Sequence, residues 1–152
     1  MSVTYTFNSP IGAVCLTEED GSITRIELID ATDEATAPTP LQREAARQIL
    51  AFLRGERQQL EFPIRMVGTP FQQRVWHALR QIPYGATRTY GEIAVEIGNP
   101  RASRAVGMAC NKNPLLLIVP CHRVIGAGGK LTGFAYGVDA KQRLLELEGN
   151  RR

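Results

Sequence analysis

Cys121 and His122 are the residues of this chain whose types and spacing point most directly to chemistry, and they are adjacent in the stretch LLLIVPCHRVIGAGG. A free thiol is only about 3% ionised at pH 7, and a neighbouring base or cation raises that fraction. The pair therefore indicates an activated nucleophile, whereas an isolated cysteine would more simply be a core residue. Neighbouring residues of an extended strand point to opposite faces, so the two side chains could interact only through a bend or a bridging water.

Two other kinds of site are disfavoured. A phosphate-binding loop requires GxxxxGK followed by Ser or Thr, but Val124 occupies the first glycine position and Leu131 follows Lys130. The chain has three cysteines, Cys15, Cys110 and Cys121, and no CxxC pair. This odd number and spacing argue against a disulfide framework and against a tetrahedral zinc site. We therefore expect reduced thiols, with Cys15 as a buried apolar residue, no metal and no cofactor.

The segments on either side of the pair must position it. Residues 115–119 form a continuous apolar run between two prolines and predict a short buried strand that ends at the cysteine. Residues 126–137 predict a flexible loop that lines the pocket of the cysteine. A helix expected at about residues 138–148 places Glu148 at its negative end, where a carboxylate is unfavourable. Glu148 is then either a surface residue or one with a task such as orienting His122.

Two short helices precede the pair. The first is expected at residues 89–97, where Thr89 and Glu92 form a capping-box pattern. The second is expected to start at Asn99-Pro100 and to run through Arg101 to about Asn111. Such a pair is a helix-turn-helix candidate, although short helix pairs are common in any α-rich domain. The second helix consists mostly of small residues, which lets its backbone approach a partner but leaves few side chains to distinguish bases. If it binds DNA, we expect little sequence preference.

The first half of the chain has the pattern of a small sheet followed by a helix. Alternating apolar residues predict strands at 3–7, 13–17 and 23–29, then a loop at 30–40. A helix is expected from Thr39-Pro40 to Gly55, and a second Thr-Pro start at Thr69 opens a helix with apolar spacing up to Ile82. We expect an α+β fold: residues 1–66 form an antiparallel sheet with one helix, and residues 67–152 form a mostly helical domain.

Composition is that of an ordinary globular protein, with 43% hydrophobic and 22% charged residues. No stretch is apolar enough to cross a membrane, and the N-terminus lacks the pattern of a secretory signal, so a cytoplasmic protein is expected. The net charge of +3 is uneven, because residues 1–66 carry 6 basic and 10 acidic side chains and residues 67–152 carry 12 and 5. Unless this is random scatter, a basic partner surface lies in the second half.

The second half resembles the O6-alkylguanine-DNA alkyltransferases, which are suicidal DNA-repair proteins. The signature of that family, I-[IVL]-P-C-H-R-[VI], stands here as IVPCHRV at residues 118–124. Three further segments match the family as well: TYGEIA at 89–94, RAVGMACNKNP at 104–114 and LLELEG at 144–149. The resemblance is strong over residues 67–149 and covers the earlier half only in its pattern of strands then helix. It implies a ribonuclease H-like first lobe and a winged helix-turn-helix-like second domain.

The resemblance assigns chemical roles to single residues. Cys121 would be the nucleophile, partly ionised and better exposed than an ordinary buried cysteine at the floor of a pocket that admits one base. His122 would be a water-bridged base whose tautomer Glu148 holds. Asn113 would brace the active-site turn. Tyr90 would donate a proton to the departing guanine and help rotate the phosphate.

The same resemblance implies the residues that meet DNA and substrate. Arg104 would enter the duplex and fill the space left by the flipped nucleotide. The remaining DNA contacts would be Ala102, Ser103, Tyr90 and Arg123, and the substrate pocket would be formed by Val119, Pro120, Phe134, Ala135, Tyr136 and Cys110.

The implied function is repair of O6-alkylguanine, chiefly O6-methylguanine, with O4-methylthymine as a further substrate to be tested. The protein would bind duplex DNA through the minor groove with little sequence specificity, flip the base out, and transfer the alkyl group irreversibly to Cys121. We expect a monomer, and cooperative binding along DNA stays open. Tyr136 stands where relatives often carry glycine or tryptophan, so the size of the alkyl group stays open too. Some relatives bind zinc in the first half, which here offers only Cys15 and no histidine.

Three rival functions are weaker. An alkyltransferase-like lesion sensor would keep the fold but lack the nucleophile, and Cys121 argues against it. A helix-turn-helix regulator would need a richer recognition helix and dimer contacts. A Cys-His hydrolase would need an oxyanion hole and turnover. Neither the regulator nor the hydrolase explains Arg104, Asn113 and Glu148 together.

Overall fold

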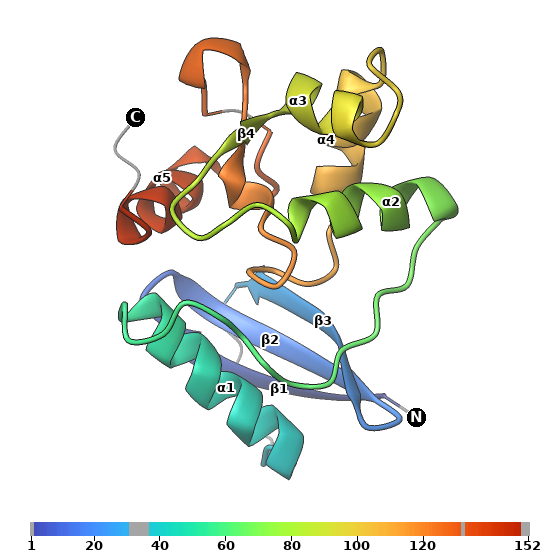
Figure 1. Cartoon of the computed structure of the whole chain (residues 1–152). Helices are drawn as coiled ribbons and strands as arrows, with labels where there is room; N and C mark the ends of the chain where they lie inside the picture. The colour runs from blue at the N-terminus through green and yellow to red at the C-terminus, as the bar shows by residue number, and fades with distance from the viewer. Residues whose placement is uncertain (1, 31–36, 132, 150–152) are drawn as a thin grey trace. The chain divides into compact units, whose positions relative to one another are not determined.

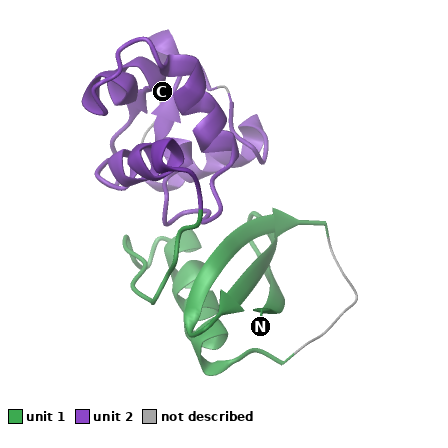
Figure 2. Cartoon of the chain, turned by 90° about the vertical axis from the view of Figure 1, so that its right-hand side faces the viewer, with its two compact units in different colours: residues 1–67 green, residues 68–152 purple. Residues whose placement is uncertain are grey.

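The computed structural model describes residues 2–30, 37–131 and 133–149, and the chain divides into two compact units, residues 1–67 and 68–152 (Figures 1 and 2). Over the described residues it contains a three-stranded antiparallel sheet and five α-helices, which confirms the predicted α+β class. None of these helices is long and apolar enough to cross a membrane. The described residues also include no group of three or more His, Cys, Asp or Glu that could hold a metal ion.

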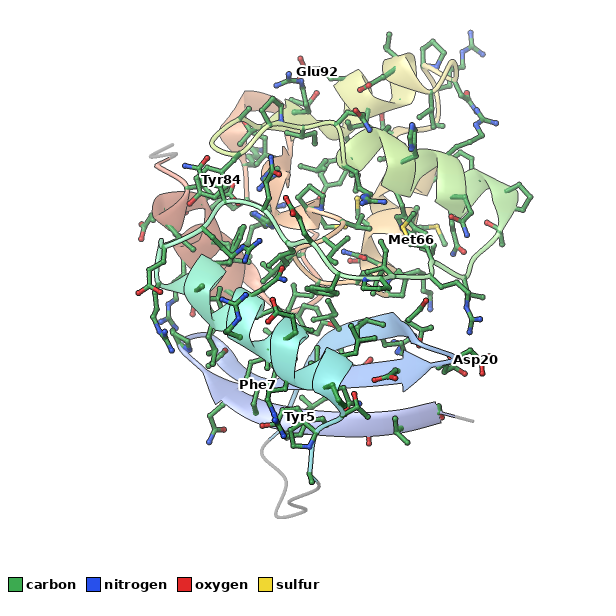
Figure 3. The ribbon with its side chains drawn as sticks, turned by 60° about the horizontal axis from the view of Figure 1, so that its bottom comes forward. Tyr5, Phe7, Asp20, Met66, Tyr84 and Glu92 are labelled. Carbon is green, nitrogen blue, oxygen red and sulfur yellow. The ribbon has the colours of Figure 1, made fainter. Side chains whose placement is uncertain are left out.

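The sheet of the first unit follows the predicted strands closely. Its strands are β1 (Ser2–Ser9), β2 (Gly12–Glu19) and β3 (Ser22–Ile29), paired in the order β1-β2-β3. Asp20 and Gly21 connect β2 to β3 with φ angles of 51° and 79°. Two positive φ angles are what a type I′ hairpin turn requires, and Asp-Gly supplies them at little steric cost. On β1, the rings of Tyr5 and Phe7 stack with centroids 6.0 Å apart (Figure 3).

Cys15 corrects one prediction about this sheet. It was expected to be buried but is only half-buried, whereas Val14 and Leu16 on either side have no exposed surface. Alternate residues of a strand face opposite sides, so the two fully buried neighbours turn Cys15 away from the core that they enter.

Helix α1 (Pro40–Leu53) packs on this sheet and begins with a capping box. The Thr39 hydroxyl accepts the backbone N–H of Gln42, whose side chain accepts the backbone N–H of Thr39 in return. Gln42 also donates to the carbonyl of Val3 at 3.0 Å, which ties the helix start to β1. Most of the loop predicted at residues 30–40 lies outside the described residues.

The second unit consists of short helices and one two-stranded parallel ladder. Its elements are α2 (Pro70–Leu79), β4 (Arg88–Thr89), α3 (Tyr90–Glu96), α4 (Ser103–Asn111), β5 (Val124–Ile125) and α5 (Val138–Leu147), with β4 paired to β5. Helix α2 ends three residues before Ile82, which stays buried in the turn that follows. Helix α4 begins at Ser103, three residues after Pro100, where the helix was predicted to start. Trp76 of α2 is buried and donates to the carbonyl of Ala109 at 2.9 Å, which joins α2 to α4.

The apolar run before Cys121 is a turn, and the predicted strand at residues 115–119 is wrong. The N–H of Val119 donates back to the carbonyl of Leu115 at 3.0 Å, and Leu117 adopts a φ of 73°. A buried turn and a buried strand both need a continuous run of apolar side chains, so the pattern alone does not separate them. The next residues, Cys121–Arg123, form a 3-10 helix, so the alternation of faces in a strand does not apply to Cys121 and His122.

Candidate active site

Asn113 holds the turn that delivers Cys121. Its Nδ2 donates to the carbonyl of Val119 at 2.8 Å, and its Oδ1 accepts the N–H of Leu115 at 2.8 Å. One side chain thus bonds both ends of the turn. It pairs the N–H of Leu115, and it gives the carbonyl of Val119 a second donor beside the N–H of Cys121. The structure therefore places Asn113 where the expected brace would act.

Cys121 is buried, with 5% of its surface exposed, and its thiol donates to the carbonyl of Cys110 at 3.5 Å. Burial, followed by the effect of Cys110, raises the pKa of the Cys121 thiol well above its ordinary value, while Asn113 and Lys141 act in the opposite direction. The expectation of a partly ionised sulfur that is better exposed than an ordinary buried cysteine is therefore wrong for this structure. The resting group is a covered, protonated thiol, and it needs a base before it can act as a nucleophile.

His122 is completely buried, and its Nε2 lies 2.6 Å from Oε2 of Glu148. Burial works to raise the pKa of Glu148, but the hydrogen bonds from His122 and Arg123 outweigh it and lower that pKa to about 2. A carboxylate can only accept, so Nε2 carries the ring proton. Nδ1 keeps its lone pair and has no hydrogen-bond partner among the described residues. Burial lowers the pKa of His122, so the ring is neutral.

Arg123 secures the other side of the same carboxylate. Its Nε and Nη2 donate to the two oxygens of Glu148 at 2.8 and 2.9 Å, and Nη1 donates to the carbonyl of Ile82 at 2.8 Å. The guanidinium also lies 5.6 Å from the ring centroid of Tyr84, which Figure 3 labels in the connection after α2. Arg123 is buried, so the expected DNA contact is wrong: every hydrogen bond it makes points inward. Glu148 is likewise no surface residue, because only 1% of its side chain is exposed.

A second group of expected residues lies on one open surface. It is a depression of about 430 Å³ lined by Tyr90, Ser103, Arg104, Gly107, Met108, Asn111 and Gly133, and we call it the α4 surface. Arg104 is exposed there and forms no ion pair with any described residue. Ala102 does not contribute to this surface because its side chain is buried at the start of α4.

The expected pocket residues divide into two sets. Val119, Pro120 and Cys110 are buried directly around Cys121, whereas Phe134, Ala135 and Tyr136 belong to the loop before α5. The rings of Phe134 and Tyr136 meet edge to face with centroids 5.8 Å apart. This loop reaches Tyr90 at Gly133, where an added Cβ would lie 2.7 Å from the phenol oxygen. A side chain at that position would displace the phenol.

Comparison with known proteins agrees with this geometry. Residues 70–150 match the family model described as "6-O-methylguanine DNA methyltransferase, DNA binding domain". A methylated-DNA–protein-cysteine methyltransferase of Methanosarcina acetivorans is 49% identical over 150 residues, covering 95% of this chain and 96% of the relative. The chain belongs to the methylated-DNA–protein-cysteine methyltransferase family. It is accordingly a DNA-binding repair enzyme of the methyltransferase class.

Solved structures of another family member resemble the whole chain. The crystal structure of the O6-methylguanine methyltransferase of Mycobacterium tuberculosis has a TM-score of 0.87 and 46% identity, covering 97% of this chain and 93% of the relative. A crystal structure of Mycobacterium tuberculosis OGT in complex with DNA also has a TM-score of 0.87 and 46% identity, covering 95% and 91%.

Lys141 is a candidate functional residue that the sequence reasoning missed. It is fully buried, its ammonium donates to the carbonyl of Val124, and Nζ lies 5.8 Å from the ring centroid of Tyr90. Burial lowers the pKa of Lys141, and its charge lowers the pKa of Cys121. The ammonium therefore acts on the thiol and also lies beside the ring of Tyr90. Its position on α5 was a usable signal, because Lys141 is three residues before Leu144 and seven before Glu148, on the buried face.

Proposed function

We propose that this protein repairs O6-alkylguanine, chiefly O6-methylguanine, in duplex DNA by moving the alkyl group onto Sγ of Cys121. The observation that carries the proposal is a buried, neutral His122 that follows the cysteine directly and whose tautomer is held by Glu148. Membership of a family named for methyl transfer from DNA to a protein cysteine supports the reaction class. The product is a thioether, which has no leaving group, so each molecule acts once.

The first step is removal of the thiol proton, because the resting Cys121 is protonated. Nδ1 of His122 has the available lone pair and takes this proton through a bridging water. The imidazolium that forms donates from Nε2 to the carboxylate of Glu148, which stabilises the new charge. Arg123 holds both oxygens of that carboxylate, so the acceptor does not have to move during the transfer.

In the second step the thiolate attacks the alkyl carbon. The S–C bond forms, the C–O6 bond breaks, and the electron pair goes to guanine. Tyr90 donates a proton to the departing base, and Lys141 stabilises the phenolate that results. The proton held by His122 then returns to the phenol, so the net result moves one proton from the thiol to guanine.

The α4 surface is the proposed DNA interface. Helix α4 enters the minor groove, and Arg104 fills the space of the extruded nucleotide; extrusion costs a few kcal/mol, less for a damaged pair. Because α4 carries few side chains that could distinguish bases, binding depends on phosphate contacts and shows little sequence preference. The helix-turn-helix assignment of α3 and α4, the winged and ribonuclease H-like character of the two units, the monomeric state and the cytoplasmic location stay predictions.

Mass spectrometry tests the proposal. After incubation with a duplex that contains O6-methylguanine, the intact protein is expected to gain one methyl group, and the modified peptide is expected to contain Cys121. Cys121→Ser should abolish the gain, whereas Cys15→Ser, a thiol on β2 outside the site, should keep it. Methyl transfer to Cys110, or more than one lesion repaired per protein, would contradict the proposal. Duplexes with O4-methylthymine or bulkier O6-alkyl groups then define the substrate range beside Tyr136.

A further inference from the structure

Met108 is a large apolar side chain left in solvent, with 68% of its surface exposed. Helix α4 does not need it for packing, because Val106, Ala109 and Cys110 form the buried face of the helix. A single exposed apolar residue is ordinary in a soluble protein. Met108, however, lines the α4 surface, where the other large side chain of the helix is Arg104.

The positions of Arg104 and Met108 place them side by side on α4. They are four residues apart, so they lie one helical turn from each other on the same face. The small residues Ser103 and Gly107 lie beside them on that face, and the polar Asn111 lies at the end of the helix. The surface therefore offers one cationic and one apolar projection to a groove of DNA.

We propose that Met108 is an apolar wedge that enters the minor groove beside Arg104 and stabilises the opened duplex. This inference rests on the proposed function of the α4 surface. Apolar side chains that enter the minor groove press between base steps and partly unstack them, which favours the opened duplex. Methionine suits this task because its unbranched, polarisable chain adapts to an irregular contact. A neutral wedge displaces no counterions, so its contribution should not depend on salt.

The test compares Met108→Ala with a matched control, Val95→Ala. Val95 is 62% exposed on α3 and does not line the α4 surface, so its truncation removes apolar surface elsewhere. Met108→Ala is expected to bind an O6-methylguanine duplex about tenfold more weakly, the effect of losing roughly 1.4 kcal/mol of apolar contact. The slope of the logarithm of affinity against the logarithm of salt concentration should equal that of wild type. Met108→Leu should restore most of the affinity. All three variants should have the melting temperature of the wild type.

Reaction with the free base O6-methylguanine separates the wedge from a role inside the active site. A free base needs no groove, so Met108→Ala should react with it at the wild-type rate and be slowed only on the duplex. Equal losses on both substrates, a changed salt slope, or a duplex affinity like that of Val95→Ala would overturn the inference. Failure of the proposed function itself would look different, because wild-type Cys121 would then accept no methyl group from the duplex or from the free base.

Discussion

Two regions of the second unit are built in opposite ways. One is the buried cluster of Cys121, His122, Arg123 and Glu148, and the other is the α4 surface. In the cluster, Glu148 accepts hydrogen bonds from His122 and Arg123 and is almost completely buried. On the α4 surface, Arg104 and Met108 are exposed, and Arg104 has no ion-pair partner among the described residues.

Under the proposed function, this difference means that the cluster is complete before DNA binds, whereas the α4 surface is completed by DNA. Charges in a low-dielectric interior must be paired, and once paired they are fixed in position, which suits proton transfer. A surface that binds phosphates and groove walls gains more binding free energy if its cation and its apolar side chain have no contacts that must first be broken. We therefore expect substitutions in the cluster to affect stability and chemistry together, and substitutions of Arg104 and Met108 on the α4 surface to affect DNA binding alone.

Glu148→Gln should have the largest effect on the cluster. The neutral amide leaves Arg123 as an uncompensated buried cation, so the free energy of unfolding should fall by about 3–5 kcal/mol. It also removes the charge that stabilises the His122 imidazolium, so methyl transfer should slow by about a hundredfold or more. Chemical denaturation and single-turnover kinetics measure the two effects. A variant with wild-type stability would show that the buried ion pair is absent in solution.

Arg123→Ala and Arg104→Ala should separate the two regions. Arg123→Ala removes a buried partner of Glu148 and should lower the free energy of unfolding by about 3 kcal/mol. Arg104→Ala should leave the melting temperature near that of wild type, weaken duplex binding, and reduce the salt slope by about one. Calorimetry and binding titrations at several salt concentrations give both quantities. An unchanged salt slope in Arg104→Ala would remove this arginine from the DNA interface.

The pH dependence of stability should report the buried histidine. An unfolded histidine has a pKa of about 6.5, and burial lowers the pKa of His122 in the folded protein. The unfolded chain therefore binds a proton that the folded protein does not, and stability should fall as the pH drops below about 6.5. A second loss should begin below pH 4.5, since the folded pKa of Glu148 is about 2.

His122→Asn supplies the variant for this pH experiment, and the exposed His77 supplies its control. His122→Asn should flatten the loss of stability between pH 6.5 and 5, whereas His77→Asn should keep the wild-type slope. Melting temperatures across this range are the measurement. Equal slopes in wild type and His122→Asn would mean that the ring is not held neutral by burial.

Gly133→Ala should have the smallest effect on methyl transfer. It tests the contact between the loop before α5 and Tyr90. Gly133 and Gly137 both have positive φ angles, 74° and 97°, so alanine at either position should cost about 1–2 kcal/mol of backbone strain. Only at Gly133 does the new Cβ meet the phenol oxygen of Tyr90, at 2.7 Å. Methyl transfer per folded molecule should therefore slow several-fold in Gly133→Ala and more than in Gly137→Ala. Equal rates would mean that the phenol is free to move.

Local features of the chain were predictable from sequence because their causes are local. The helix starts at Thr39 and Thr69, the capping box at Thr89 and the Asp20-Gly21 turn depend on residues within three or four positions of one another. The segment before Cys121 was predicted as a strand because almost all of its residues are apolar. A buried strand and a buried turn share that composition. The side chain of Asn113 holds it as a turn, because it donates to the carbonyl of Val119 and accepts the N–H of Leu115. No periodicity in the sequence reveals these two hydrogen bonds.

By itself, the sequence determined the α+β class, the family and the position of the cysteine, since these depend on local propensity and on a contiguous motif. Only the tertiary structure decided that the resting thiol is covered and protonated, that Arg123 faces inward, and that Lys141 lies near Tyr90. Glu148 is 25 positions from Arg123 along the chain, and their contact exists only because α5 packs on the 3-10 helix of Cys121–Arg123. Burial and charge pairing depend on neighbours in space, and those neighbours are chosen by packing.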